Sequence, residues 1–260
     1  MKAGRAARYI IQAFLWIAVA CSSSSLALAS ETSPCAIEKH AGQTYSICTF
    51  DLRRYELKLF WRDGDGKAYG SVAGLVDGLI RARQTPIFAM NAGMYHPDLS
   101  PVGLFVANGA QMKTANTSNG SGNFQLKPNG VFYLQGSEAG ILETGTYLKH
   151  GLKADLATQS GPMLVINGQL HPRFSPEGQS RKIRNGVGVR DSHTVVFAIS
   201  SDGVTFTEFA ELFRQQLRCS NALFLDGSIS SMYAPSINRA DAPLPAGPII
   251  AAFERMAASH

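Results

Sequence analysis

The segment RYELKLFW, residues 54–61, alternates polar and apolar side chains along its whole length. This period of two is typical of a β-strand with one buried and one solvated face. Further along, residues 71–83 place apolar side chains at helical spacing. Pro86 separates this predicted helix from the apolar run IFAMN, residues 87–91, which indicates a buried strand. The chain therefore combines strands and helices within its first third.

Between residue 91 and about residue 200, short apolar runs are separated by turn signals. Three of these signals are Asn-Gly pairs, at Asn108-Gly109, Asn129-Gly130 and Asn167-Gly168. Each pair can supply the positive φ angles of a tight hairpin. A second helix is expected to begin with Thr207 as its N-cap and to lead into the strand ALFLD, residues 222–226. We predict an α+β fold in which two packed amphipathic helices cover a large mixed, mostly antiparallel sheet, in a single domain.

The N-terminus has the pattern of a secretory signal peptide. Three cations precede an apolar run over residues 9–21, and Ala27 and Ala29 supply the A-x-A pattern of a cleavage site. The run is short for a membrane span, which needs about 20 residues, and Ala18 is a weak residue for lipid attachment at Cys21. We therefore favour a signal peptide over residues 1–29 above a membrane or lipid anchor, a domain over residues 30–260, and a periplasmic or secreted protein.

The charge of the chain does not indicate a nucleic-acid partner. The formal net charge is +5, and Lys2, Arg5 and Arg8 of the predicted signal peptide supply three of these charges. The length of the chain after the predicted signal peptide suits one domain. We expect no nucleic acid and no stable membrane span in the mature chain.

Three cysteines remain after the predicted signal peptide, namely Cys35, Cys48 and Cys219. Export to an oxidising compartment makes a disulfide the default for a close pair. Cys35 and Cys48 flank the short polar segment KHAGQTYS, which can turn back as a hairpin, and we predict that they pair. Cys219 follows an apolar helical pattern and is expected to pack as a small hydrophobe, not to react as a nucleophile.

Polar residues stand where three of the expected strands end. Asn91 and Gly93 follow the first strand, and Ser160 and Gly161 follow the second. In each case an ordinary turn competes with a site at which polar groups converge on a ligand. Asp226 ends the third strand, and a glycine and three serines follow it within five residues.

A cluster of cations precedes the strand RNGVGV, residues 184–189. Arg184 shares a face with Gly186 and Gly188, and we expect these glycines to leave that face open for a ligand. The planar guanidinium of Arg184 would suit a phosphate or a carboxylate there. A solvated strand edge that resists edge pairing is the alternative.

Familiar catalytic motifs are missing from the sequence. It contains no G-x-S-x-G, H-E-x-x-H, C-x-x-C or G-x-x-x-x-G-K pattern. The histidines do not cluster at metal-ligand spacing, and we interpret His96 and His171 as loop histidines. We expect no metal and no cofactor.

Six ordered segments together resemble the phosphodiester glycosidase family, most closely its bacterial exported branch. They are MNAGMY (90–95), PVGLFV (101–106), GNFQLKPNGVF (122–132), ATQSGPMLV (157–165), RNGVGV (184–189) and ALFLDGSIS (222–230). The resemblance covers residues 35–250. It implies cleavage of the bond between a sugar's anomeric carbon and a phosphodiester, as in the removal of N-acetylglucosamine from a phosphorylated acceptor.

The resemblance also implies a set of site residues: Asn91, Gly93, Ser160, Gly161, Arg184, Asp226 and Gly227. Ser228 stands where many relatives have a second glycine. A phosphate monoester leaves more readily than a sugar alkoxide, so one carboxylate and one cation can be sufficient. We assign Asp226 as nucleophile or general base and Arg184 to the departing phosphate.

The remaining site residues would complete the pocket. Gly227 and Ser228 would give Asp226 room and hydrogen bonds, and Asn91 and Ser160 would bind sugar or phosphate oxygens. The residues that stay open as a second carboxylate are Asp98, Asp191 and Glu208.

The favoured function is hydrolysis of a glycosyl-1-phosphodiester in envelope or extracellular polysaccharide, as part of carbohydrate metabolism. The expected partner is a phosphorylated glycan, with N-acetylglucosamine-1-phosphate as one candidate group. A noncatalytic exported glycan-binding protein that acts in envelope polysaccharide assembly is the main alternative. A phosphodiesterase that breaks the phosphorus-oxygen bond with a divalent metal is the third.

Overall fold

The computed structural model describes residues 33–175, 177–226 and 229–255. The predicted signal peptide lies outside these ranges. Three antiparallel sheets form the described chain. The first has the spatial order β1 (Cys35–His40), β2 (Gln43–Asp51), β13 (Thr194–Ser200), β12 (Asn185–Asp191), β14 (Asn221–Asp226), β10 (Met163–Ile166) and β11 (Gln169–Leu170).

Two five-stranded sheets complete the set. The second sheet has the order β16 (Arg239–Ala240), β15 (Met232–Ala234), β4 (Phe88–Asn91), β17 (Ile249–Glu254) and β3 (Tyr55–Phe60). The third has the order β6 (Ala110–Lys113), β5 (Phe105–Ala107), β9 (Leu156–Ser160), β7 (Gly130–Gln135) and β8 (Glu138–Glu143). The predicted α+β class with mostly antiparallel strands is confirmed, and its strands are divided among three sheets.

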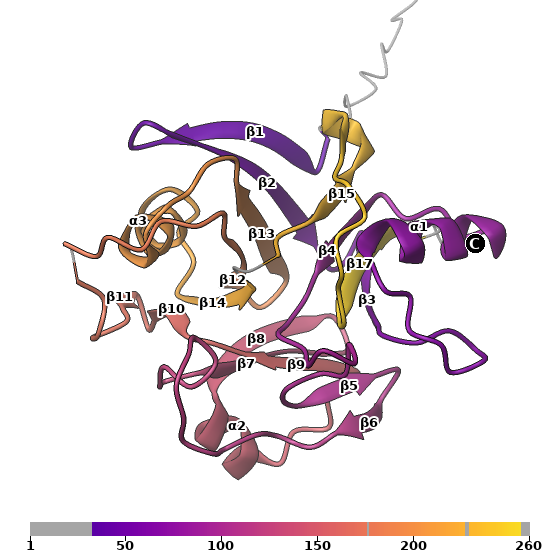
Figure 1. Ribbon diagram of the computed structural model, residues 1–260, viewed down its shortest axis with the longest axis horizontal. Coiled ribbons are helices and arrows are strands. Elements are labelled where there is room, and N and C mark those ends of the chain that lie inside the picture. Colours follow the sequence, from indigo (N-terminus) through magenta and orange to yellow (C-terminus); the bar gives the residue numbers. More distant parts are fainter. Residues whose placement is uncertain (1–32, 176, 227–228, 256–260) are drawn as a thin grey trace, which may run out of the picture. The chain divides into compact units, whose positions relative to one another are not determined.

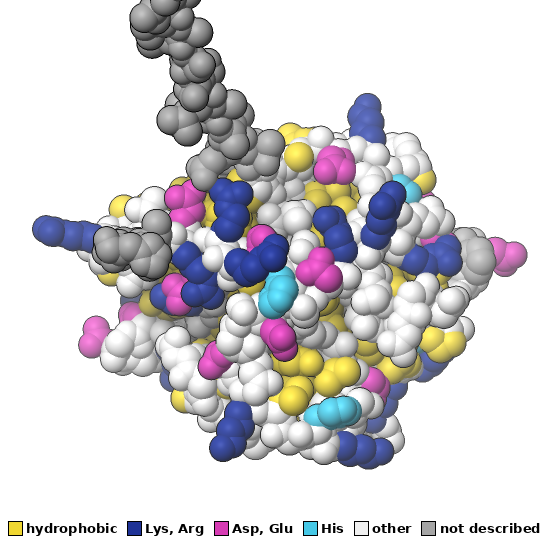
Figure 2. Space-filling view, turned by 180° about the vertical axis from the view of Figure 1, so that it is seen from behind, with side chains coloured by type: hydrophobic (Ala, Val, Ile, Leu, Met, Phe, Trp, Pro, Cys, Tyr) yellow, Lys and Arg dark blue, Asp and Glu magenta, His cyan; other side chains and the backbone are white. Residues whose placement is uncertain are grey.

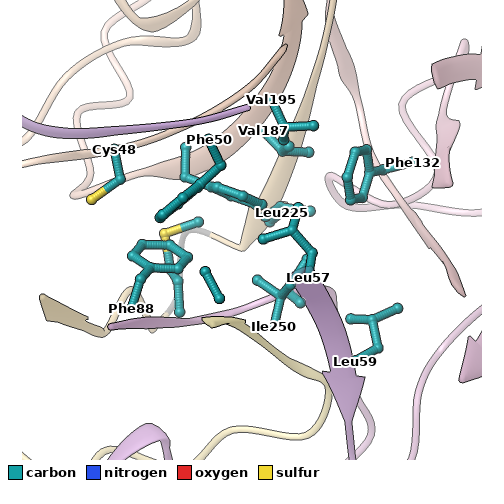
Figure 3. Packing of buried hydrophobic residues seen from close by; sticks show 14 of the residues in the cluster. Cys48, Phe50, Leu57, Leu59, Phe88, Phe132, Val187, Val195, Leu225 and Ile250 are labelled. Atoms are coloured by element: carbon teal, nitrogen blue, oxygen red, sulfur yellow. The ribbon is translucent and has the colours of Figure 1, made fainter. Parts of the chain in front are cut away.

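One hydrophobic core lies between the three sheets. Phe197 of β13 contacts Phe88 of β4 and Phe132 of β7, with ring centroids 5.0 and 6.2 Å apart. Figure 3 shows how side chains of all three sheets, among them Leu225 and Ile250, point into this space. Burying an aromatic or branched aliphatic side chain of this size contributes about 1.5–3 kcal/mol. The core therefore fixes the three sheets against one another.

A helix covers the other face of each sheet (Figure 1). The helices are α1 (Val72–Arg81), α2 (Thr144–His150) and α3 (Phe206–Glu211), and α3 continues into the π-helix η1 (Leu212–Gln216). Leu75 of α1 packs on the second sheet and Tyr147 of α2 on the third. Phe209 of α3 and Phe213 of η1 pack on the first. A 3-10 turn, η2 (Pro235–Ile237), separates β15 from β16.

Both predicted helices are present in the structure, and a third helix, α2, was not predicted. Helix α1 begins one residue later than predicted, because Ser71 is its N-cap and accepts a hydrogen bond at its Oγ from the Gly74 amide at 2.9 Å. The second predicted helix begins earlier than expected because Thr205, not Thr207, is its N-cap. Thr205 and Glu208 form a capping box, which satisfies two backbone amides reciprocally. Helix α2 was not predicted, since its seven residues are too few for a clear helical period.

Two of the three Asn-Gly pairs form the expected hairpin turns. Asn108-Gly109 joins β5 to β6 and Asn167-Gly168 joins β10 to β11, each with two positive φ angles. The prediction for Asn129-Gly130 was wrong. Asn129 is buried and donates to the Phe124 carbonyl at 2.9 Å, while Gly130 begins β7. A side-chain anchor has taken the place of a turn there.

The predicted disulfide is present in the structure. Cys35 and Cys48 are direct partners in the register of β1 and β2 and are bonded to each other. Cys219 is buried beside the helical cover of the first sheet. Burial raises the pKa of its thiol to about 12, so the thiolate needed for nucleophilic attack is not populated at neutral pH.

The surface mixes charges of both signs. Figure 2 shows basic and acidic side chains interspersed across the middle of one face. Exposed ion pairs such as Lys58–Glu56, at 3.0 Å, stabilise the fold by well under about 1 kcal/mol each. Within the described ranges, no helix has the length and apolar character needed to cross a membrane.

Candidate active site

Strand ends from all three sheets meet at one place. Strand β4 of the second sheet ends at Asn91, and β9 of the third ends at Ser160. In the first sheet, Asn185 at the start of β12 is paired with Asp226 at the end of β14. Hydrogen bonds, described below, link these ends across the sheet boundaries. Polar residues that lie far apart in the sequence are therefore assembled at the junction of the sheets.

Asn185 is the central link of this junction. Its Nδ2 donates to the side-chain oxygen of Asn91 at 2.8 Å and to the Asn91 carbonyl at 2.9 Å. Its Oδ1 accepts a hydrogen bond from the Asp226 amide at 2.8 Å. Asn185 and Asn91 are fully buried. One amide side chain thus fixes the end of β14 relative to the end of β4.

Asn91 anchors the chain that follows Asp226. Its Nδ2 donates to the Ile229 carbonyl at 2.6 Å, and its Oδ1 accepts from the Ser231 amide at 3.0 Å. With the bonds from Asn185, both polar atoms of the Asn91 side chain are engaged. The structure thus assigns Asn91 an anchoring position at the site. Gly227 and Ser228, the two further residues expected there, lie outside the described residues.

Ser160 ties the third sheet to the same point. Its Oγ donates to the Leu225 carbonyl at 2.8 Å, directly before Asp226, and the residue is fully buried. Gly161 follows in a space closed by Asn129, because a Cβ on Gly161 would lie 2.6 Å from the Asn129 Cβ. The backbone at this position accordingly requires glycine.

Gly93 has a similar steric role on the other side of the junction. A Cβ there would lie 2.8 Å from the Oγ1 of Thr158, whose hydroxyl donates to the Ala92 carbonyl at 3.1 Å. The glycine therefore allows the chain after β4 to pass close to β9.

Asp226 is mostly buried, with 6% of its surface exposed. Its backbone carbonyl accepts a hydrogen bond from the Ser230 Oγ at 3.0 Å. Tyr95 lies within reach of the Asp226 charge: burial and that charge raise the pKa of the Tyr95 phenol to about 12. The Tyr95 hydroxyl donates to the Pro245 carbonyl at 2.6 Å. A tyrosine ring in a fixed position is thus part of the surroundings of Asp226.

Arg184 precedes Asn185 and is almost completely buried. Its guanidinium carbon lies 3.7 Å from the ring centroid of Phe206 and 5.4 Å from that of Phe224. Its Nε donates to the Val204 carbonyl at 2.9 Å and its Nη2 to the Ser180 carbonyl at 3.0 Å. Two aromatic rings and two carbonyls thus hold the guanidinium in a defined orientation.

The third guanidinium nitrogen of Arg184 differs from the other two in its hydrogen bonding. Nη1 is buried and has no hydrogen-bond partner within the described part of the chain. Burial lowers the pKa of Arg184 to about 10, so the group stays charged at neutral pH. A buried cationic donor without a partner is costly. An anion at Nη1 would remove that cost.

The expectation of an open face beside Arg184 was wrong. A Cβ on Gly186 would lie 3.1 Å from the Phe209 ring, and a Cβ on Gly188 would lie 2.6 Å from the Cys219 sulfur. These glycines let the aromatic side chains of α3 and η1 approach β12 closely. Their face is filled by packing, and glycine serves the contact between helix and sheet.

The three residues considered as a second carboxylate have other contacts. Asp98 is exposed and accepts hydrogen bonds from the amide and hydroxyl of Ser100. Asp191 lies at the far end of β12 from Asn185. Glu208 caps α3 and pairs with Arg181 at 3.0 Å. Asp226, in contrast, is bound at the strand junction through the hydrogen bond from its amide to Asn185.

Two residues of the junction carry no role in the sequence analysis, Asn185 and Tyr95. Both stand inside the quoted segments RNGVGV and MNAGMY. A polar residue at an inward position of a strand otherwise lined by valines was the available signal for Asn185, because a buried amide requires partners. For Tyr95 the sequence offered no comparable signal.

Removal of the Asn185 amide should destabilise the fold strongly. In Asn185→Ala, three hydrogen bonds are lost and buried polar groups of Asn91 and Asp226 lose partners, which costs roughly 2–4 kcal/mol. Urea unfolding measures this cost. Asn221→Ala is the matched control at the other end of the paired strand, where the Oδ1 accepts one hydrogen bond in an exposed turn. Equal losses in the two variants would contradict the anchoring role of Asn185.

The fold and the junction define an α+β protein whose polar site is assembled from the strand ends of three antiparallel sheets. Residues 84–250 match the model of a family described as phosphodiester glycosidase. The protein YigE of Escherichia coli (strain K12), itself described as uncharacterized, is 36% identical over 190 residues, which cover 73% of this chain and 74% of YigE. The chain belongs to the phosphodiester glycosidase family.

Solved structures share the fold. The catalytic domain of zebrafish N-acetylglucosamine-1-phosphodiester alpha-N-acetylglucosaminidase, auto-inhibited by its pro-peptide, superposes with a TM-score of 0.61 at 14% identity, covering 87% of this chain and 85% of that one. A hypothetical protein from Synechocystis superposes with a TM-score of 0.50 at 16% identity, covering 85% and 61%. At these identities the likeness concerns the fold alone.

Proposed function

We propose that the protein is an exported hydrolase that cleaves the bond between a sugar's anomeric carbon and a phosphodiester. Its substrate would be a glycosyl-1-phosphodiester in an envelope or extracellular polysaccharide, with N-acetylglucosamine as one candidate sugar. Family membership supports the reaction class. The disulfide fits export, with residues 1–29 as the signal peptide and residues 30–260 as the mature domain.

The observation that carries this proposal is the state of the Arg184 guanidinium. It is buried, charged and oriented, and its Nη1 lacks a partner within the described residues. Arg184 directly precedes Asn185, and Asn185 binds the amide of Asp226 at the end of β14. The cation of Arg184 therefore belongs to the same pair of strand ends as the carboxylate of Asp226. This arrangement suits a reaction in which a phosphate departs with negative charge.

In the proposed reaction, the Asp226 carboxylate attacks the anomeric carbon or removes a proton from water that attacks it. The bond between that carbon and the phosphate oxygen breaks, and its electron pair stays on the phosphate. Arg184 stabilises the phosphate monoester as it leaves. Water supplies the hydroxyl of the free sugar, directly or after a glycosyl-enzyme intermediate. No proton has to reach the leaving oxygen.

The positions of Asn91 and Ser160 favour a supporting role over direct binding of sugar. Both side chains are bound to the backbone around Asp226. Gly93 and Gly161 allow these close approaches. In the proposal, Gly227 and Ser228 remain the residues that contact the substrate next to Asp226.

The proposal is tested with the purified mature chain and a panel of α- and β-glycosyl phosphodiesters, with and without a chelator. We expect free sugar to be released in both conditions. In ¹⁸O-labelled water, the label should enter the sugar and not the phosphate, because the carbon-oxygen bond is broken. Label in the phosphate would indicate a phosphodiesterase. Binding of the diesters without any release would indicate a glycan-binding protein.

A further inference from the structure

The connection between β11 and β12 begins with a tight turn, His171-Pro172-Arg173-Phe174. The Phe174 amide donates to the His171 carbonyl at 3.1 Å, which closes the turn. Pro172 stands at the second position, where its fixed φ suits a turn. The Nδ1 of His171 accepts a hydrogen bond from the Arg173 amide at 3.2 Å. The four residues therefore fix the two rings at the ends of the turn relative to each other.

These two rings stack and are held to the first sheet and to α3. The centroids of His171 and Phe174 are 4.7 Å apart, and their planes differ by 24°. His171 is buried, and its amide donates to the Leu164 carbonyl of β10 at 3.2 Å. The Thr207 hydroxyl of α3 donates to the Ser175 carbonyl at 2.8 Å. Phe174, which is half-buried, is therefore fixed from both of its neighbours along the chain.

Phe174 belongs to a stack of rings that ends at Arg184. The centroids of Phe174 and Phe206, the first residue of α3, are 5.1 Å apart, and their planes differ by only 10°. The guanidinium carbon of Arg184 lies 3.7 Å from the centroid of Phe206. A second ring has no room beside the guanidinium on that face, so Phe174 stacks on the opposite face. Phe206 thus lies between Phe174 and the guanidinium.

The stack also joins the guanidinium to the strand that ends at Asp226. The ring of Phe206 meets that of Phe224 at an angle of 82°, with centroids 4.9 Å apart. Phe224 stands two residues before Asp226 on β14. The Nη2 of Arg184 donates to the carbonyl of Ser180, which belongs to the same connection between β11 and β12. This connection therefore supplies both a stacking ring and a carbonyl that orient the guanidinium.

We propose that Phe174 is a positioning residue that directs the Nη1 of Arg184 toward the phosphate of the substrate. Phe174 acts through Phe206, because arginine stacks on aromatic faces and the ring of Phe206 supports the guanidinium. Nε and Nη2 are bound to carbonyls, so a displaced Phe206 ring moves chiefly Nη1, which has no partner among the described residues. The proposal rests on the proposed function and adds a residue outside the six family segments.

The kinetic test uses Phe174→Leu, which removes the flat ring and keeps an apolar side chain. We compare kcat/KM for a glycosyl phosphodiester with kcat/KM for a 4-nitrophenyl glycoside, whose leaving group carries no phosphate. The ratio of the two should fall about 10-fold, mainly through a higher KM for the diester. Phe174→Tyr keeps the ring and should keep the wild-type ratio. A merely structural role would instead lower kcat for both substrates alike.

Phe253→Leu is the matched control for this substitution. Phe253 is a half-buried ring on β17 that also lies near a cation, since the Lys58 Nζ is 5.4 Å from its centroid. It belongs to the second sheet and packs against Phe60. We expect this variant to keep the wild-type ratio of the two substrates.

A second measurement needs no turnover. In protein labelled with ¹⁵N-arginine, the Nε–H resonance that disappears in Arg184→Met belongs to Arg184. The ring current of Phe206 should shift this resonance upfield in the wild type, and the upfield shift should be smaller in Phe174→Leu. Dimethyl phosphate, a phosphodiester without a sugar, should perturb the Arg184 resonances of the wild type and bind about 10-fold more weakly to Phe174→Leu.

An identical Arg184 resonance in Phe174→Leu and the wild type would overturn the positioning role, and so would an unchanged ratio of the two substrates. If dimethyl phosphate leaves the Arg184 resonances of the wild type unperturbed, Nη1 is not directed at a phosphate and the proposal is wrong. If neither substrate is cleaved but the resonance and the affinity for dimethyl phosphate change as expected, the proposed reaction fails and the role of Phe174 is supported.

Discussion

Asp226→Asn should lower kcat/KM for a glycosyl phosphodiester by roughly 1,000-fold or more while the protein remains folded. The substitution removes the charge and the nucleophilic or basic oxygen, yet it keeps the shape of the side chain. The backbone bonds of this residue, from its amide to Asn185 and from Ser230 to its carbonyl, do not depend on the carboxylate. Catalysis and fold are therefore separable at this position.

Sugar release and urea unfolding should be measured on the same preparations. Asp191→Asn is the matched control, since this carboxylate lies at the opposite end of β12 and accepts from the His193 amide in an exposed turn. We expect that variant to retain nearly full activity. Full turnover by Asp226→Asn would remove Asp226 from the mechanism, and a loss in Asp191→Asn of the same size would point to a second carboxylate.

Arg184→Met should lower kcat/KM for phosphodiesters by about 100–1,000-fold, the usual cost of losing one preorganised group that stabilises a departing or developing anion. Stability should change by only about 1 kcal/mol, because the substitution removes a buried charge and leaves an apolar side chain between Phe206 and Phe224. The Val204 carbonyl keeps its bond from the Lys182 amide. The loss of activity is thus expected without unfolding.

The leaving group provides the decisive comparison for Arg184. The leaving group of a 4-nitrophenyl glycoside is 4-nitrophenolate, which carries no phosphate. Arg184→Met should therefore lower kcat/KM for this glycoside far less than for the phosphodiester. Arg190→Met is the matched control on the same strand, where the Nε donates to the Leu217 carbonyl. Equal losses on both substrates would show that Arg184 only supports the fold of the site.

The pH dependence follows from the pKa of Arg184, which burial lowers to about 10. Below this value the guanidinium is charged and can hold the phosphate; above it the proton and the attraction are lost. KM for the phosphodiester should therefore rise as the pH passes about 10, and the 4-nitrophenyl glycoside should not show this rise. The free energy of unfolding should rise over the same pH range, whereas phosphate binding weakens. The reason is that the buried guanidinium, once it has lost its proton, no longer carries the cost of burying a charge.

Several local features were predictable from the sequence because they depend on neighbours along the chain. Alternation over residues 54–61 became β3, and the helical spacing within residues 71–83 became α1. The Asn-Gly pairs at 108 and 167 became hairpin turns, since positive φ is a property of the residues themselves. The six family segments indicated the family for the same reason: each is a short run of residues.

Features that depend on distant partners were not predictable in this way. The pair Asn129-Gly130 has the composition of a turn, but Phe124 and Thr144 bind Asn129 and make it an anchor. Gly186 and Gly188 look like an open surface until the aromatic rings of α3 and η1 are placed against them. A sequence pattern records that a side chain is small, and only packing decides what fills the space.

The sequence by itself determined the kinds of element, the disulfide pair, the family and the candidate residues Asp226 and Arg184. The tertiary structure decided that the strands divide into three sheets and that Asn185 and Asn91 hold the end of β14. It also decided that Nη1 of Arg184 is buried without a hydrogen-bond partner among the described residues. The physical reason is the range of the interactions. Periodicity and turn chemistry act over a few residues, whereas the junction joins residues 91, 160, 185 and 226, which only the shared core of the three sheets brings together.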